Sequence, residues 1–65
     1  MDINAARELL EDSMDFDYVE SEGDDCIRFD LNDSSFWIYS SGTIGDLEHL
    51  PPILQKQIRS ILATC

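Results

Sequence analysis

An alternation of apolar and polar side chains in the middle of this sequence limits its fold most strongly. Ile27, Phe29 and Leu31 alternate with Arg28 and Asp30. A period of two places the three apolar side chains on one face of a β-strand and the two charged ones on the other. We therefore predict a strand that buries one face against a core, which other elements must supply.

Two further strands are predicted beside this one. Residues 32–34 have the Asn, Asp and Ser side chains of a tight turn, and residues 35–40 hold a run of large apolar side chains typical of a strand. The period is also two over residues 16–19, where Phe16 and Tyr18 are expected to share one face. Three strands joined by short connections predict an antiparallel meander.

The two ends of the chain have helical periodicity instead. Apolar side chains recur with a period near 3.6 over residues 3–14 and again over residues 53–62, where Ile53 is expected to lie on the buried side with the rest. Residues 46–50 are predicted as a single helical turn. The predicted fold class is α+β, with an N-terminal helix, a three-stranded antiparallel meander and a C-terminal helix. Residues 1–65 form a single compact acidic domain, because a chain this short cannot divide its apolar residues between two cores.

Negative charge is concentrated in one half of the chain. Residues 1–33 hold twelve acids and two bases, and residues 34–65 hold two of each, so the first half carries the whole net charge of −10. Such a field speeds encounter with cationic surfaces and opposes approach to nucleic acid or anionic membranes. We expect the partner to be a basic protein or nucleoprotein complex, with no direct binding to nucleic acid or membrane.

No acidic motif in the sequence has the pattern of a catalytic or calcium site. Adjacent carboxylates such as Asp24 and Asp25 act as an acid and a base only where an apolar cleft raises one pKa, and 65 residues leave little room for such a cleft. An EF-hand loop starting at Asp15 would have Val19 at position 5 and Cys26 at position 12, where oxygen ligands are required. We predict no catalytic residue, no cofactor and no calcium site, and therefore no enzyme.

The remaining potential ligands are too few for structural zinc. Cys26, Cys65 and the single histidine, His49, give three ligands where such sites use four. The two cysteines are expected to be reduced thiols, since disulfide-stabilised domains of this size have denser cysteines. The first residues have neither the basic nor the apolar segment of a signal peptide, so we expect a cytoplasmic location.

Two aromatic residues are candidate binding anchors. Trp37 and Tyr39 alternate with Phe36 and Ile38, so each pair occupies one face of its strand. If both helices pack on one face of the sheet, one aromatic pair stays exposed and suits an interface. If the helices cover both faces, all four side chains belong to the core.

The acids themselves suggest a mechanism. Alternate residues of a strand project the same way about 6.6 Å apart, so Asp15 and Asp17 would present a repeat of negative charge like that of a polynucleotide backbone. The alternative is that the acids only keep the protein soluble. The candidate partner-binding residues are Asp12, Asp15, Asp17, Glu20, Glu22, Asp24, Asp25, Asp30, Trp37 and Tyr39.

With its small size, its helix-plus-meander layout and the acids of residues 8–33, the chain resembles the small acidic inhibitors of phages and mobile elements, in particular anti-CRISPR proteins and related DNA mimics. The resemblance implies an inhibitor that blocks a nucleic-acid-handling complex by occupying its binding surface, in the host cytoplasm if a phage encodes it. The oligomeric state stays open, with a monomer favoured. Two alternatives stay open. One is an immunity or antitoxin protein that neutralises a basic nuclease, and the other is a small acidic adaptor domain.

Overall fold

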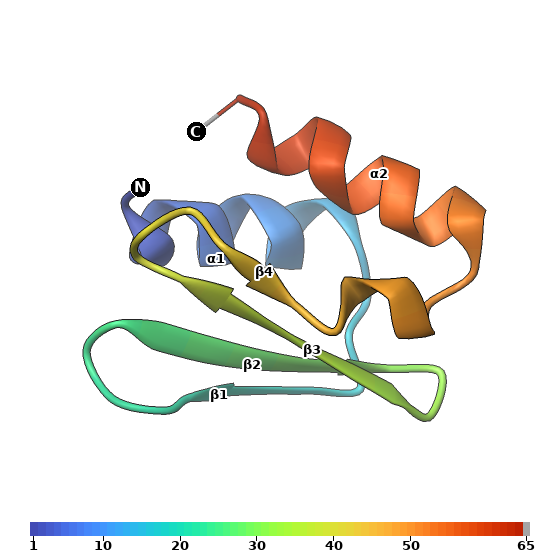
Figure 1. Cartoon of the computed structure of the whole chain (residues 1–65), viewed down its shortest axis with the longest axis horizontal. Coiled ribbons are helices and arrows are strands. Elements are labelled where there is room, and N and C mark those ends of the chain that lie inside the picture. The colour runs from blue at the N-terminus through green and yellow to red at the C-terminus, as the bar shows by residue number, and fades with distance from the viewer. Residues whose placement is uncertain (65) are drawn as a thin grey trace.

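The computed structural model describes residues 1–64 and confirms the α+β class (Figure 1). It has an N-terminal helix, an antiparallel sheet and a C-terminal helix, as the sequence predicts, but the sheet has four strands rather than three. Along the chain the elements are α1 (Ile3–Ser13), β1 (Tyr18–Ser21), β2 (Cys26–Leu31), β3 (Ser34–Tyr39), β4 (Ile44–Gly45), the 3-10 turn η1 (Leu47–His49) and α2 (Pro52–Leu62).

The strand absent from the sequence prediction is β4, at one edge of the sheet. The strand order is β1-β2-β3-β4, and Ile44 pairs with Ile38 in antiparallel register. Gly42 has φ 94°, a conformation that suits glycine, and it lets the chain reverse direction after β3. A strand of two residues is too short to show any period, so no apolar pattern indicates it.

The predicted turn between β2 and β3 is confirmed. Asn32 and Asp33 form a two-residue loop with φ values of 52° and 65°. Positive φ at both positions defines the turn type whose twist matches that of a hairpin. The Asp17 carboxylate accepts a hydrogen bond of 3.1 Å from the Asn32 amide, which ties this turn to the segment before β1.

The first strand begins later than predicted, at Tyr18 rather than Phe16. Phe16 instead lies in the loop after α1, where its ring centroid is 5.0 Å from that of Phe29 and 5.9 Å from that of Phe36. Tyr18 is 51% exposed, so Phe16 and Tyr18 do not share a face as predicted. Burial of the Phe16 ring against two core rings explains the difference, since a buried aromatic ring contributes more than one strand position.

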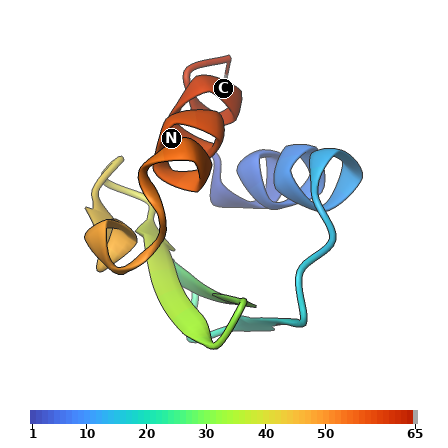
Figure 2. The ribbon, with the colours of Figure 1, turned by 90° about the vertical axis from the view of Figure 1, so that its right-hand side faces the viewer.

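Both helices pack on the same side of the sheet (Figure 2). Asp2 caps α1, because its Oδ1 accepts hydrogen bonds of 3.0 and 3.2 Å from the Asn4 and Ala5 amides. One apolar cluster joins the helices, η1 and the inner face of the sheet. Its buried members are Ile3, Ala6, Leu10, Ile27, Phe29, Phe36, Ile38, Leu47, Leu50, Ile58 and Leu62.

The second helix starts at Pro52, because a proline fits the first turn of a helix, where its missing N–H would have no partner. Ile58 and Leu62 are buried, as expected, but Ile53 is 80% exposed. At 3.6 residues per turn, Ile53 lies about 140° around the helix from Ile58, so it faces solvent and its predicted burial is wrong. Within residues 1–64, neither helix has both the length and the apolar character that crossing a membrane requires.

Candidate protein-interaction surface

The open face is the side of the sheet opposite the helices, formed by the outward side chains of β1, β2 and β3. On β3, Phe36 and Ile38 are completely buried beneath the helices. Trp37 is half-buried and Tyr39 is 37% exposed on the other side. Of the two arrangements that the sequence allowed, the structure has the one in which Trp37 and Tyr39 lie outside the core.

Arg28 lies at the centre of the open face and makes two kinds of contact. Its Nε donates to Asp30 Oδ1 at 3.0 Å and its Nη2 donates to Asp30 Oδ2 at 3.3 Å, a forked ion pair. Its Cζ also lies 5.9 Å from the centroid of the Trp37 ring, within cation–π range. The guanidinium group is thus held between a carboxylate and an aromatic ring.

Asp30 is fixed on three sides by hydrogen bonds. Besides the two from Arg28, Ser35 Oγ donates to its Oδ1 at 2.6 Å. The Ser35 hydrogen bond, with Arg28 beside it, lowers the pKa of Asp30 from its usual value. Asp30 is therefore charged, but its charge is already matched within the protein.

The aromatic pair is also held in place. Trp37 Nε1 donates a hydrogen bond of 2.8 Å to Glu22 Oε1. The Tyr39 ring lies against Gly45, where an added Cβ would come within 3.3 Å of Tyr39 Cε2, so glycine leaves room for the ring. These contacts hold the side chains of Trp37 and Tyr39 in a defined orientation on the surface.

Cys26 lies beside these residues as a free, half-buried thiol. Burial, together with the negative charge of Glu22, raises the pKa of the Cys26 thiol above its usual value. The thiol is thereby less often ionised and a weaker nucleophile at neutral pH. Cys65, the other predicted thiol, lies outside the described residues.

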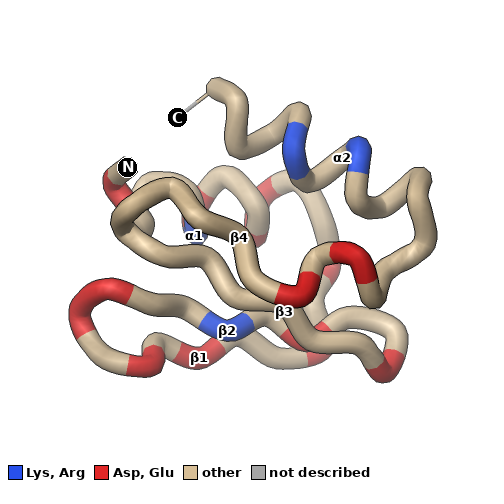
Figure 3. Tube along the Cα trace, in the orientation of Figure 1, with Lys and Arg blue, Asp and Glu red and all other residues tan. Residues whose placement is uncertain are grey.

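Four of the other candidate acids lie in the loops at the two ends of β1 (Figure 3). Asp15 and Asp17 lie in the loop before β1, and Asp24 and Asp25 lie in the turn after it. We call these four residues the acidic rim, and all four are exposed. Two of the remaining candidates, Glu20 and Glu22, are exposed on and just after β1, and Asp12 is exposed on α1.

Asp15 and Asp17 do not lie on a strand, which was the basis of their expected phosphate-like spacing. Both residues precede β1, so the regular rise of a strand does not set their separation. Asp17 is instead held by the hydrogen bond from the Asn32 amide. Any likeness to a polynucleotide rests on the distribution of acids over the surface and not on a repeat along one strand.

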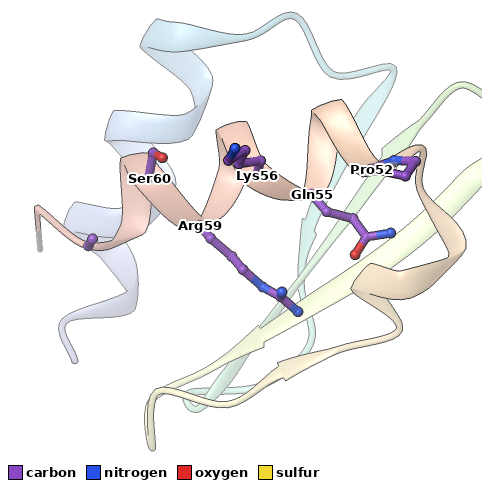
Figure 4. Close-up of a pocket in the computed structure, with 6 residues that line it drawn as sticks. Pro52, Gln55, Lys56, Arg59 and Ser60 are labelled. Atoms are coloured by element: carbon purple, nitrogen blue, oxygen red, sulfur yellow. The ribbon is translucent and has the colours of Figure 1, made fainter.

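The C-terminal helix α2 differs in charge from the acidic rim. It holds Lys56 and Arg59 and no acid. A shallow hollow lies along it, and Figure 4 shows Gln55 and Arg59 extending from the helix beside this hollow. Gln55 Nε2 donates to the Leu50 carbonyl at 2.7 Å, which fixes the start of the helix to η1.

One group of potential metal ligands was not anticipated from the sequence. Oxygen or nitrogen atoms of Asp46, Glu48 and His49 lie within 4.8 Å of one another around η1. All three side chains are exposed, and exposed carboxylates gather in this way without binding a metal. We assign no metal site to them, and His49 is exposed.

Sequence reasoning also missed two residues of the open face. Arg28 was placed on the same strand face as Asp30, but its ion pair with Asp30 and its contact with Trp37 were not predicted. Tyr18 was assigned to the same face as Phe16, and so it was not considered as an anchor. A search of the sequence for side chains two positions apart on the same face of a strand would have found both residues.

No family model, curated protein or solved structure matches this chain. The resemblance to small acidic inhibitors stays a prediction.

Proposed function

We propose that this protein is a non-enzymatic inhibitor that docks its acidic side onto a basic, nucleic-acid-binding surface of a partner protein. The division of charge supports the proposal most directly. Of the eight candidate acids, the seven other than Asp30 are exposed, and they lie on α1, on the strand β1 and in the loops around the open face. The helix α2, which packs beside α1 on the same side of the sheet, carries only Lys56 and Arg59 as charged residues.

A rigid acidic surface favours binding to such a partner in two ways. Its summed field speeds association, because opposite charges attract over a Debye length before contact. Carboxylates that the fold holds in place also lose little conformational freedom on binding, as with Asp17 at the Asn32 amide. A groove that accepts phosphates is rich in Lys and Arg and suits carboxylates equally well.

The test compares two variants that lose the same charge. The rim-side variant carries Asp15→Asn and Asp24→Asn, and a control variant carries Asp46→Asn and Glu48→Gln. Both have net charge −8, since each removes two acids from a protein of −10. Within residues 1–64, none of the four side chains takes part in a hydrogen bond or ion pair, so both variants should fold.

The immobilised protein is used to capture proteins from a nuclease-treated bacterial lysate, and the captured partner is then purified. We expect a nucleic-acid-binding protein that a DNA or RNA oligonucleotide displaces. The rim-side variant should associate with it about tenfold more slowly, and the control variant should keep a rate within about twofold of the parent. Equal rates for the two variants, or a partner that no oligonucleotide displaces, would contradict the proposal.

The same experiment distinguishes an immunity protein from a broader inhibitor. An immunity protein is expected to capture one basic nuclease and to block its cleavage of nucleic acid in a purified assay. An inhibitor of a nucleic-acid-handling complex is expected to prevent that complex from binding its nucleic acid.

A further inference from the structure

The open face already contains one complete site for a guanidinium group. Arg28 stacks over Trp37 and forms a forked ion pair with Asp30. An aromatic ring combined with a carboxylate is a favourable environment for arginine, because the planar guanidinium stacks on the ring and pairs with both carboxylate oxygens. The protein itself provides the occupant of this site.

The neighbouring strand β1 repeats these two groups without an occupant. Tyr18 and Glu20 are two positions apart on β1, so their side chains project from the open face about 6.6 Å apart. Glu20 is paired in register with Arg28, and Tyr18 is paired with Asp30. Glu20 therefore lies beside Arg28 and Tyr18 lies beside Asp30, one strand away, while Trp37 lies on β3, on the other side of β2.

Both groups on β1 are available to a partner. Tyr18 is 51% exposed. In the part of the chain that the structure describes, the Glu20 carboxylate accepts no hydrogen bond and forms no ion pair, while Arg28 is paired with Asp30. The strand β1 is also the edge of the sheet, so a partner segment reaches it without displacing any element.

Charge favours a cationic occupant. Glu20, Glu22 and Asp30 outnumber the single cation Arg28 on and beside the open face, and the acidic rim lies at both ends of β1. We propose that Tyr18 and Glu20 bind an arginine side chain of a basic partner protein, by stacking on the ring and pairing with the carboxylate. This inference rests on the proposed function and specifies the partner group that the acidic side recognises.

The experiment uses the full chain and two synthetic peptides of equal charge, one with five Gly-Arg repeats and one with five Gly-Lys repeats. The single tryptophan, Trp37, lies on the same face and reports binding by its fluorescence, and amide chemical shifts of β1 locate it. The arginine peptide should bind at least about fivefold more tightly than the lysine peptide. Tyr18→Leu and Glu20→Gln should each reduce this preference to within about twofold.

Glu48→Gln is the matched control for Glu20→Gln, because it removes the same charge from an exposed side chain outside the open face. It should leave the arginine preference unchanged. Equal affinity of the two peptides, or an arginine preference that survives both β1 variants, would overturn the inference. The proposed function would still stand in that case, provided that the rim-side variant slows association with the captured partner.

Discussion

Among single residues, Asp30 shows how the protein matches a charge internally instead of presenting it to a partner. Ser35 and Arg28 both donate to its carboxylate, and Ser35 makes the shortest of these hydrogen bonds at 2.6 Å. The lowered pKa of Asp30 means that the folded protein favours its ionised form. Asp30 is thus a positioning residue for Arg28. Glu20 lies opposite Arg28 on β1 and, in residues 1–64, forms no ion pair.

The first prediction concerns the pH dependence of this network. The pKa of Asp30 is lower in the folded than in the unfolded protein, so its contribution to stability is present above the unfolded pKa of about 3.9. That contribution is lost as pH falls through the folded pKa. In Ser35→Ala, NMR titration should show a higher pKa for Asp30, and urea unfolding should show a loss of stability at pH 7 that becomes smaller at pH 2.

Ser60→Ala serves as the control, because Ser60 is exposed on α2 and, within residues 1–64, its hydroxyl forms no hydrogen bond. It should leave the pKa of Asp30 unchanged, and any gain in the free energy of unfolding from the higher helix propensity of alanine should be equal at pH 7 and pH 2. An unchanged pKa in Ser35→Ala would show that Arg28 alone fixes the charge of Asp30.

Among the elements, the turn of the β2–β3 hairpin holds a residue, Asp33, that is less favourable there than glycine. Asp33 has φ 65°, which costs a residue with a Cβ about 1 kcal/mol relative to glycine. Asp33→Gly should therefore raise the free energy of unfolding by up to about 1 kcal/mol in urea titrations. Asp33→Asn removes the same charge but keeps a side chain, so Asp33→Gly should be the more stable of the two. Equal stability would mean that the gain comes from charge.

The predictable elements are those whose apolar pattern repeats several times. The alternation from Ile27 to Leu31 predicted β2 within one residue, since each buried side chain confirms the register of the others. Phe16 gave the wrong start for β1, because its burial depends on Phe29 and Phe36, which are distant in sequence. The two residues of β4 were absent from the prediction, because their pairing with β3 is set by tertiary structure.

The types of residue on the candidate surface could be predicted from the sequence, but the contacts between them could not. The exposure of the acids follows from their placement in turns, as for Asp24 and Asp25 in the turn after β1. The exposure of Trp37 depended on the side that the helices cover, and alternation on one strand does not determine that side. The hydrogen bond from Trp37 to Glu22 joins residues fifteen positions apart, so only the fold reveals it.

For the whole molecule, the net charge of −10 is large relative to its size. The protein measures 27 × 22 × 20 Å, and its Cα radius of gyration is 10.5 Å. At 10 mM salt the Debye length is about 30 Å, so every acid repels every other across the molecule. At 150 mM salt the Debye length falls to about 8 Å, and only neighbouring acids still interact strongly. Folding gathers these charges and is opposed by their repulsion.

The last prediction is that salt stabilises the fold. Thermal unfolding followed by circular dichroism should be cooperative at pH 7, and Tm should rise between 10 and 150 mM NaCl. If screening contributes about 1 kcal/mol, the rise is about 4–8 °C for a domain of this size. The rim-side variant, with two fewer acids, should have a higher Tm at 10 mM and a smaller increase with salt. A Tm that is constant or falls with salt would show that the paired charges, such as Arg28 with Asp30, outweigh the repulsion among the acids.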